Sequence, residues 1–293
     1  MAAEQLGAPG DLSEREREAV EALLYRLADD EFVVADRYTD WQCQGPTLEA
    51  DIAIANIAQD ELGHARLWYD LLEDFGYEES ELIWERDAGE FRHATLCELA
   101  FDSGDWADAV VRSYLYDVAE FLRLESLAET SYPRLADRVE KVQGEEDYHR
   151  EHAQNWLERL CEDAEGTRRV QRAVDELYPY ALTLFEPCVA PTARRGEGGA
   201  AAEAERIEDD IVELGVRPTS LDQLREEWYD ITGAFLDGLG VSVPGREELD
   251  DLVAEQTGRD GSHTADWERQ YNELTYTYRM LDRTEARRLM ADP

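Results

Sequence analysis

Two pairs of residues with metal-ligand spacing are the most informative feature of this chain. The sequence contains a glutamate followed by a Glu-x-x-His pair, twice over: Glu31 with Glu61 and His64, then Glu120 with Glu146 and His149. Residues three apart in a helix lie on one face, so the two members of each pair can reach the same ion. Two such halves facing each other are the ligand pattern of carboxylate-bridged di-iron centres in four-helix bundles. Carboxylate and imidazole suit iron or manganese. We therefore predict a two-metal site at these residues, the six candidate ligands.

The candidate glutamates interrupt apolar stripes. Apolar residues occupy the positions one turn before three of them, namely Leu27, Ile57 and Val142. A lone buried carboxylate costs several kcal/mol unless it is paired or bound to a metal. Four glutamates and two histidines in one core therefore favour a cation. A metal-free network of buried polar side chains is the alternative that the pattern leaves open.

The Glu-x-x-His motif alone carries little weight in a chain this rich in glutamate. A third match, Glu90 to His93, falls in an irregular stretch without an apolar stripe, and we interpret it as a coincidence. The first two matches differ because each lies on an apolar helix face and follows a glutamate in a neighbouring helix. Only those two enter the predicted site.

Several neighbouring side chains could support the predicted site. Asp117 lies one turn before Glu120 and competes with it as a ligand. Asp60 and Glu145 directly precede the glutamates of the two pairs, where they could orient the histidines by hydrogen bonds or be ordinary solvated carboxylates. We expect His152 to lie at the surface or just behind the site.

The elements that must position these residues are helices throughout. Apolar residues recur at spacings of three and four, glycine and proline fall mainly between such stretches, and we find no strand alternation. The predicted helices span residues 12–42, 47–75, 105–130, 133–162, 167–186, 219–238 and 263–288. Asp11 or Ser13 would cap the first helix, and Pro133 would open the fourth. We predict an all-α protein in three parts: a bundle with the metal site (1–187), a flexible acidic loop rich in glycine and alanine (188–210), and C-terminal helices packed on the bundle (211–293).

The composition excludes several classes of function. A net charge of −40, from 69 acidic and 29 basic residues, argues against nucleic-acid binding, which needs a basic face. Such charge is instead typical of a salt-rich cytoplasm, where ions screen the repulsion. The four cysteines form no C-x-x-C pair, so neither a zinc ribbon nor a redox motif is indicated. Without a signal peptide or a membrane-spanning run, we expect a cytoplasmic protein with no membrane partner.

Four segments resemble a known family, the C subunits of phenylacetyl-CoA epoxidase, a multicomponent ring 1,2-monooxygenase. Residues 51–66 (DIAIANIAQDELGHAR) carry the closest resemblance, and residues 258–264 (GRDGSHT) resemble the family's Gly-x-x-Gly-x-His-Thr signature. Leu27 to Trp41 and the stretch around Tyr148 to Leu160 resemble its first and fourth helices. The resemblance covers about residues 20–285, apart from an expanded loop near 190–210.

This resemblance implies a ferritin-like bundle in a complex that degrades phenylacetate aerobically. It implies a homologous A subunit whose di-iron centre epoxidises the ring of phenylacetyl-CoA, a small B subunit, and a flavin/iron–sulfur reductase. C subunits of this family are structural partners whose metal ligands are lost, whereas this chain has all six. We therefore expect a structural partner with an intact di-iron ligand set, and whether it also catalyses stays open. The alternatives are a stand-alone ferritin-like di-iron oxidase or iron-handling protein, and a metal-free adaptor.

Overall fold

The protein is all-α, as predicted. The computed structural model describes residues 5–101, 104–191 and 199–280, and no strand occurs among them. The α-helices are α1 (Glu14–Thr39), α2 (Leu48–Glu73), α3 (Thr95–Glu98), α4 (Trp106–Leu127), α5 (Pro133–Leu160), α6 (Ala164–Ala181), α7 (Gly199–Glu213), α8 (Leu221–Gly238), α9 (Leu249–Leu252) and α10 (Ala265–Met280). Short helical turns are η1 (Pro9–Asp11), η2 (Ser80–Trp84), η3 (Ala88–Glu90), η4 (Leu182–Phe185) and η5 (Arg246–Glu248).

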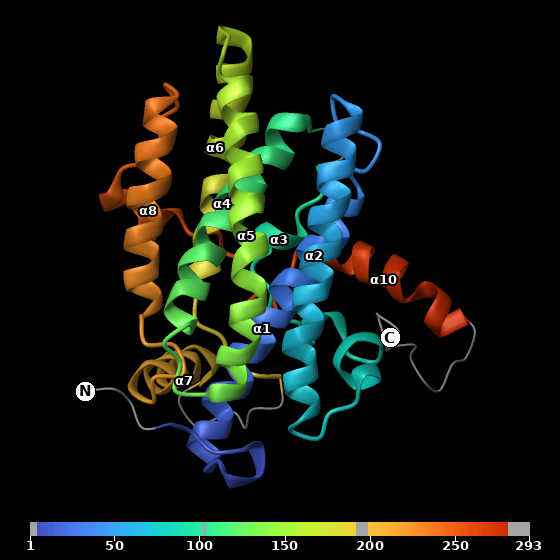
Figure 1. Ribbon diagram of the computed structural model, residues 1–293, viewed down its shortest axis with the longest axis vertical. Helices are drawn as coiled ribbons and strands as arrows, with labels where there is room; N and C mark the ends of the chain where they lie inside the picture. Colours follow the sequence, from blue (N-terminus) through green and yellow to red (C-terminus); the bar gives the residue numbers. More distant parts are fainter. Residues whose placement is uncertain (1–4, 102–103, 192–198, 281–293) are drawn as a thin grey trace.

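Two helical hairpins, α1–α2 and α4–α5, form the central four-helix bundle (Figure 1). Helices α2 and α5 run side by side in opposite directions, which completes the bundle. Local sequence sets the helix starts. Ser13 begins α1 with a reciprocal capping box to Glu16, Thr47 caps α2, and Pro133 occupies the first turn of α5. The predicted cap and the predicted proline position are both confirmed.

Helix α1 is buried on almost every side, which explains how acidic residues enter the core. Helix α2 packs on one side of it, and α3 and α7 pack on others. Consecutive acidic residues Asp29, Asp30 and Glu31 are therefore all fully buried. Asp29 pairs with Arg86 at 2.8 Å, and Asp30 pairs with Arg259 at 2.8 Å. The first two acids are thus neutralised by arginines, while Glu31 points into the bundle.

The segment after α6 differs from the prediction. We predicted a flexible loop over 188–210, but α7 begins at Gly199 and packs against α1. Its buried Ile207 and Ile211 face the core, and Arg206 Nη2 donates to Glu18 Oε2 at 2.8 Å. The alanine-rich start of α7 has high helix propensity, but its glycines led us to predict a loop. Residues 188–191 of that predicted loop lie outside any helix, and 192–198 lie outside the described residues.

The C-terminal helices pack on the bundle. Trp228 of α8 is fully buried and donates from Nε1 to the Leu115 carbonyl of α4 at 2.9 Å. Gln270 of α10 reaches the Val33 carbonyl of α1 at 3.3 Å. Both predicted helices exist, with α10 described up to Met280; the predicted continuation through 281–288 lies outside the described residues.

Candidate metal centre

The structure brings the six candidate ligands together at the centre of the bundle. Glu31 comes from α1, Glu61 and His64 from α2, Glu120 from α4, and Glu146 and His149 from α5. They form two overlapping groups with ligand atoms within 4.8 Å of one another: Glu31, Glu61, His64 and Glu120; and Glu61, Glu146 and His149. Every one of these residues is buried, with at most 2% of its surface exposed. The predicted convergence is confirmed; that the residues bind metal stays a prediction.

Most inward-facing polar atoms of this cluster have no hydrogen-bond partner among the described residues. They are Oε1 of Glu31, both carboxylate oxygens of Glu61, Glu120 and Glu146, and Nδ1 of His64 and His149. Buried polar atoms in folded proteins are nearly always satisfied, so such a concentration needs an explanation. Carboxylate oxygens and imidazole nitrogens that converge without hydrogen bonds are the donor set that a divalent cation would use. The residues therefore fit a metal centre.

Each histidine is held from behind by a carboxylate on the opposite helix. His64 Nε2 donates to Glu145 Oε2 at 2.6 Å, and His149 Nε2 lies 3.3 Å from Asp60 Oδ2. With Nε2 engaged outwards, Nδ1 faces the cluster, 3.2 Å from Glu146 Oε1 in the case of His64. Metal-binding histidines in proteins are oriented in this way. Asp60 and Glu145 thus lie where a ligand-orienting role requires them.

The α4 carboxylate that joins the cluster is Glu120. Asp117 is also buried, but it accepts a hydrogen bond from Ser113 Oγ at 3.2 Å and belongs to neither group. On the α1 side, Trp68 Nε1 donates to Glu31 Oε2 at 2.7 Å and fixes that carboxylate. His152 is half-buried and likewise outside both groups.

Without a metal, the cluster must hold protons. Burial and the neighbouring carboxylates raise the pKa of Glu31 and raise that of Glu120 to about 8. Burial opposes the ionisation of Glu146, but the adjacent imidazoles of His149 and His64 outweigh it and lower its pKa to about 2. His64 resists charging because it is buried, yet Glu146 and the other glutamates raise its pKa to about 9. Cation binding would therefore displace protons from imidazole and carboxyl groups.

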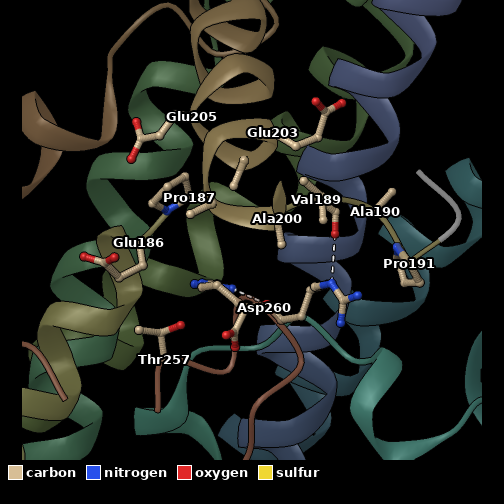
Figure 2. A pocket seen from close by; sticks show the side chains of 14 residues that line it. Glu186, Pro187, Val189, Ala190, Pro191, Ala200, Glu203, Glu205, Thr257 and Asp260 are labelled. Atoms are coloured by element: carbon tan, nitrogen blue, oxygen red, sulfur yellow. Dashed lines mark hydrogen bonds between the residues drawn. The ribbon is translucent and has the colours of Figure 1, made fainter. Parts of the chain in front are cut away.

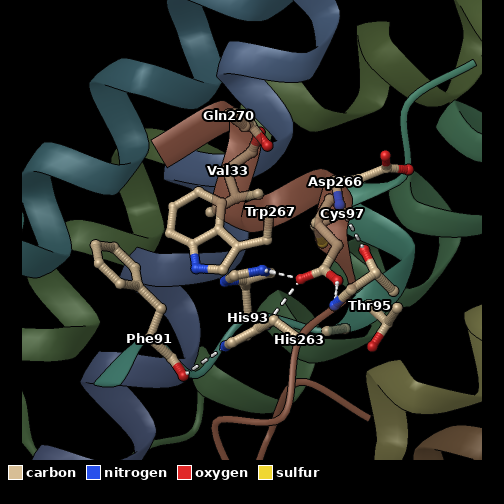
Figure 3. Close-up of polar contacts among 12 residues, drawn as sticks. Val33, Phe91, His93, Thr95, Cys97, His263, Asp266, Trp267 and Gln270 are labelled. Carbon is tan, nitrogen blue, oxygen red and sulfur yellow. Dashed lines mark hydrogen bonds and ion pairs between the residues drawn. The ribbon is translucent and has the colours of Figure 1, made fainter. Parts of the chain in front are cut away.

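A second buried cluster, His93 with Glu98 and His263, was not predicted (Figure 3). Glu98 Oε2 accepts from His93 Nε2 at 2.6 Å and from His263 Nδ1 at 2.7 Å, and Thr264 N donates to Glu98 Oε1 at 2.6 Å. His263 Nε2 also faces a carbonyl acceptor, that of Phe91, at 3.1 Å. Both ring nitrogens of His263 therefore face oxygen acceptors. The contacts have hydrogen-bond lengths, so we interpret the cluster as a hydrogen-bonded clamp.

The third Glu-x-x-His match is indeed a coincidence as a ligand pair, because Glu90 instead accepts from the Asp87 backbone N–H at 2.8 Å. His93 matters through Glu98 and His263, which lie far apart in sequence. The GRDGSHT segment was the sequence feature that could have indicated this contact. Gly258 and Gly261 both have positive φ, and a Cβ on either would come within 2.1 Å of the carbonyl oxygen of His93 or Gly89. The glycines let this segment approach closely enough for His263 to reach Glu98.

Comparison with known proteins is consistent with this architecture. The family model described as "Phenylacetic acid catabolic protein" matches residues 5–285. The chain belongs to this family. Within the family, it is 31% identical over 224 residues to the C subunit of 1,2-phenylacetyl-CoA epoxidase from Escherichia coli (strain K12), covering 72% of this chain and 87% of the relative. The predicted ferritin-like fold is thereby confirmed for this member of the phenylacetic acid catabolic protein family.

This family member also has a surface cavity remote from the six candidate ligands. The cavity, of about 250 Å³, is lined by the segment after η4, the start of α7 and the turn at 257–260 (Figure 2). Arg92, whose Nε donates to the Val189 carbonyl at 2.8 Å, lies in its wall. None of the six candidate ligands lines it. Among the described residues, no helix is both long and apolar enough to cross a bilayer.

Proposed function

We propose that this chain is the C-type subunit of a phenylacetyl-CoA epoxidase that acts in aerobic phenylacetate degradation. The observation that carries the proposal is its similarity to the E. coli relative over 87% of that protein. In this role it is the structural partner of a catalytic A subunit, with a B subunit and a flavin/iron–sulfur reductase completing the system. Phenylacetyl-CoA is the substrate of the complex, which operates in the cytoplasm.

The six candidate ligands would hold two divalent ions, most suitably iron, with manganese as the alternative. Carboxylate oxygens on Glu61, Glu120 and Glu146 that accept no hydrogen bond support this assignment. When bound, iron would supply one-electron and dioxygen chemistry. The chain itself excludes water by burying the cluster, and it orients the histidines through Asp60 and Glu145.

Burial favours a structural over a catalytic role. The six residues expose at most 2% of their surface, so an aromatic ring could not contact them without rearrangement. The intact ligand set is the one feature that favours the second candidate, a stand-alone ferritin-like di-iron oxidase. The two candidates differ in whether the chain needs a partner.

Co-expression with an A-type subunit tests this proposal. We expect the two chains to elute together at high potassium chloride and to support epoxidation with the B subunit and reductase. A variant carrying Glu61→Gln and His64→Ala should lose metal yet still assemble, since both side chains face the bundle interior, and the complex should keep its activity. Separate elution at high salt would refute the partnership. Loss of epoxidation in an assembled variant complex would instead assign a catalytic role to this chain.

A further inference from the structure

A buried arginine adjoins one side of the candidate metal centre. Arg123 follows Glu120 by one turn of α4, and its side chain is 6% exposed. Its Nη2 lies 3.4 Å from Glu120 Oε1 and 3.9 Å from Glu31 Oε1. Neither contact has hydrogen-bond geometry, and Nη2 has no hydrogen-bond partner among the described residues. The guanidinium therefore acts on these two carboxylates through its charge.

The charge of Arg123 is not fully balanced by its other neighbour, Asp30. Arg123 Nη1 donates to Asp30 Oδ2 at 3.1 Å. Asp30, however, already receives both terminal nitrogens of Arg259, at 2.9 and 2.8 Å. One carboxylate faces two guanidinium groups, which leaves one positive charge in excess. That excess lies on the side of Glu31 and Glu120, in a region where burial weakens screening.

On the other side of the cluster, among the described residues, no arginine contacts Glu61 or Glu146. Within the described part of the chain, the ion pairs of Glu61 and Glu146 are with the histidines alone. The Glu31 carboxylate is also held in place, because its Oε2 accepts a hydrogen bond from Trp68. The four carboxylates thus divide into a pair that contacts an internal guanidinium, Glu31 and Glu120, and a pair that does not, Glu61 and Glu146.

We propose that Arg123 makes the two metal positions unequal. The group formed by Glu61, Glu146 and His149 takes a divalent ion first, because no guanidinium, which is permanently charged, lies beside its carboxylates. The second ion, which needs Glu31 and Glu120, binds more weakly, since it must approach a fixed guanidinium of like charge in a poorly screened interior. This inference rests on the metal centre in the proposed function and adds an order of filling to it.

Titration of the metal-free protein with Mn²⁺ tests this order. Calorimetry on the full chain should resolve two dissociation constants at least tenfold apart, and metal analysis after gel filtration should find close to one ion per chain. Arg123→Met, which keeps bulk but removes the charge, should bring the constants together and retain two ions. Arg123→Lys keeps the positive charge and should preserve the separation of the two constants. It provides a second measurement if Arg123→Met fails to fold.

Arg112→Met is the matched control. Arg112 is also buried in α4, but it donates to the Leu99 carbonyl at 2.9 Å and lies against the Phe101 ring, 4.5 Å from its centroid. We expect it to bind manganese like the native protein. Equal affinity for both ions in the native protein, or an unchanged separation in Arg123→Met, would overturn the proposal. If no variant binds manganese, the metal centre itself is wrong, while assembly with the A subunit remains a separate result.

Discussion

At the scale of single residues, the two histidines of the centre each lie between an inner glutamate and an outer carboxylate. Replacing Glu145 by alanine should leave His64 free to rotate and should weaken manganese binding by about tenfold, the usual consequence of removing a partner behind a ligating histidine. Asp147→Ala is the control, because it removes the same charge from α5 at a side chain that is 67% exposed. Calorimetric titration of both variants measures the difference. An equal loss in both would mean that general electrostatics, not orientation, is responsible.

His93 should make the fold sensitive to acid. Burial and the neighbouring His263 lower its pKa from 6.5 to about 4 in the folded protein. The unfolded chain therefore binds a proton more readily, so this stabilising contribution is complete above pH 6.5 and is lost as the pH falls towards 4. The difference corresponds to roughly 3 kcal/mol. Urea unfolding at pH 7 and pH 4.5 should show a larger loss of stability in the native protein than in His93→Gln. Parallel losses would contradict this assignment.

At the scale of elements, the turn at 258–261 connects the C-terminal region to the bundle by close backbone contact. Gly258→Ala should destabilise the protein by more than about 2 kcal/mol, because it adds a left-handed conformational cost to a clash. The added Cβ would meet the His93 carbonyl oxygen at 2.0 Å. Gly238→Ala, at the end of α8 with no atom within 4 Å of the added Cβ, should change stability by no more than about 1 kcal/mol. Denaturant unfolding compares the two, and similar effects would argue against the close approach.

At the scale of the whole molecule, a net charge of −40 should govern the response to salt. Carboxylates repel one another over about 10 Å at 0.1 M salt but over only about 3 Å at 1 M. The melting temperature should therefore rise markedly between low and molar potassium chloride. Substituting the salt with an uncharged osmolyte of equal osmolality controls for general solvent effects. A midpoint that does not move with salt would refute adaptation to a salt-rich cytoplasm.

Local patterns in the sequence were enough to predict the helices of the bundle and the six candidate ligands. Ser13 and Pro133 act within one turn of their own helix, and Glu61 and His64 share a face because of helical geometry alone. The helical period also placed the glutamates on the apolar faces that a bundle must bury. These features depend on neighbours a few residues away, which a sequence displays directly.

Tertiary structure alone decided which charges meet. Arg123 looks like an ordinary helix arginine in the sequence, and only the packing of α1 against α4 places it beside Glu31. Glu98 and His263 lie 165 residues apart and come together through a backbone approach that two glycines permit. Helix α7 likewise depends on α1 to bury its isoleucines. Electrostatic energy depends on distance and burial in space, and neither follows from the order of residues along the chain.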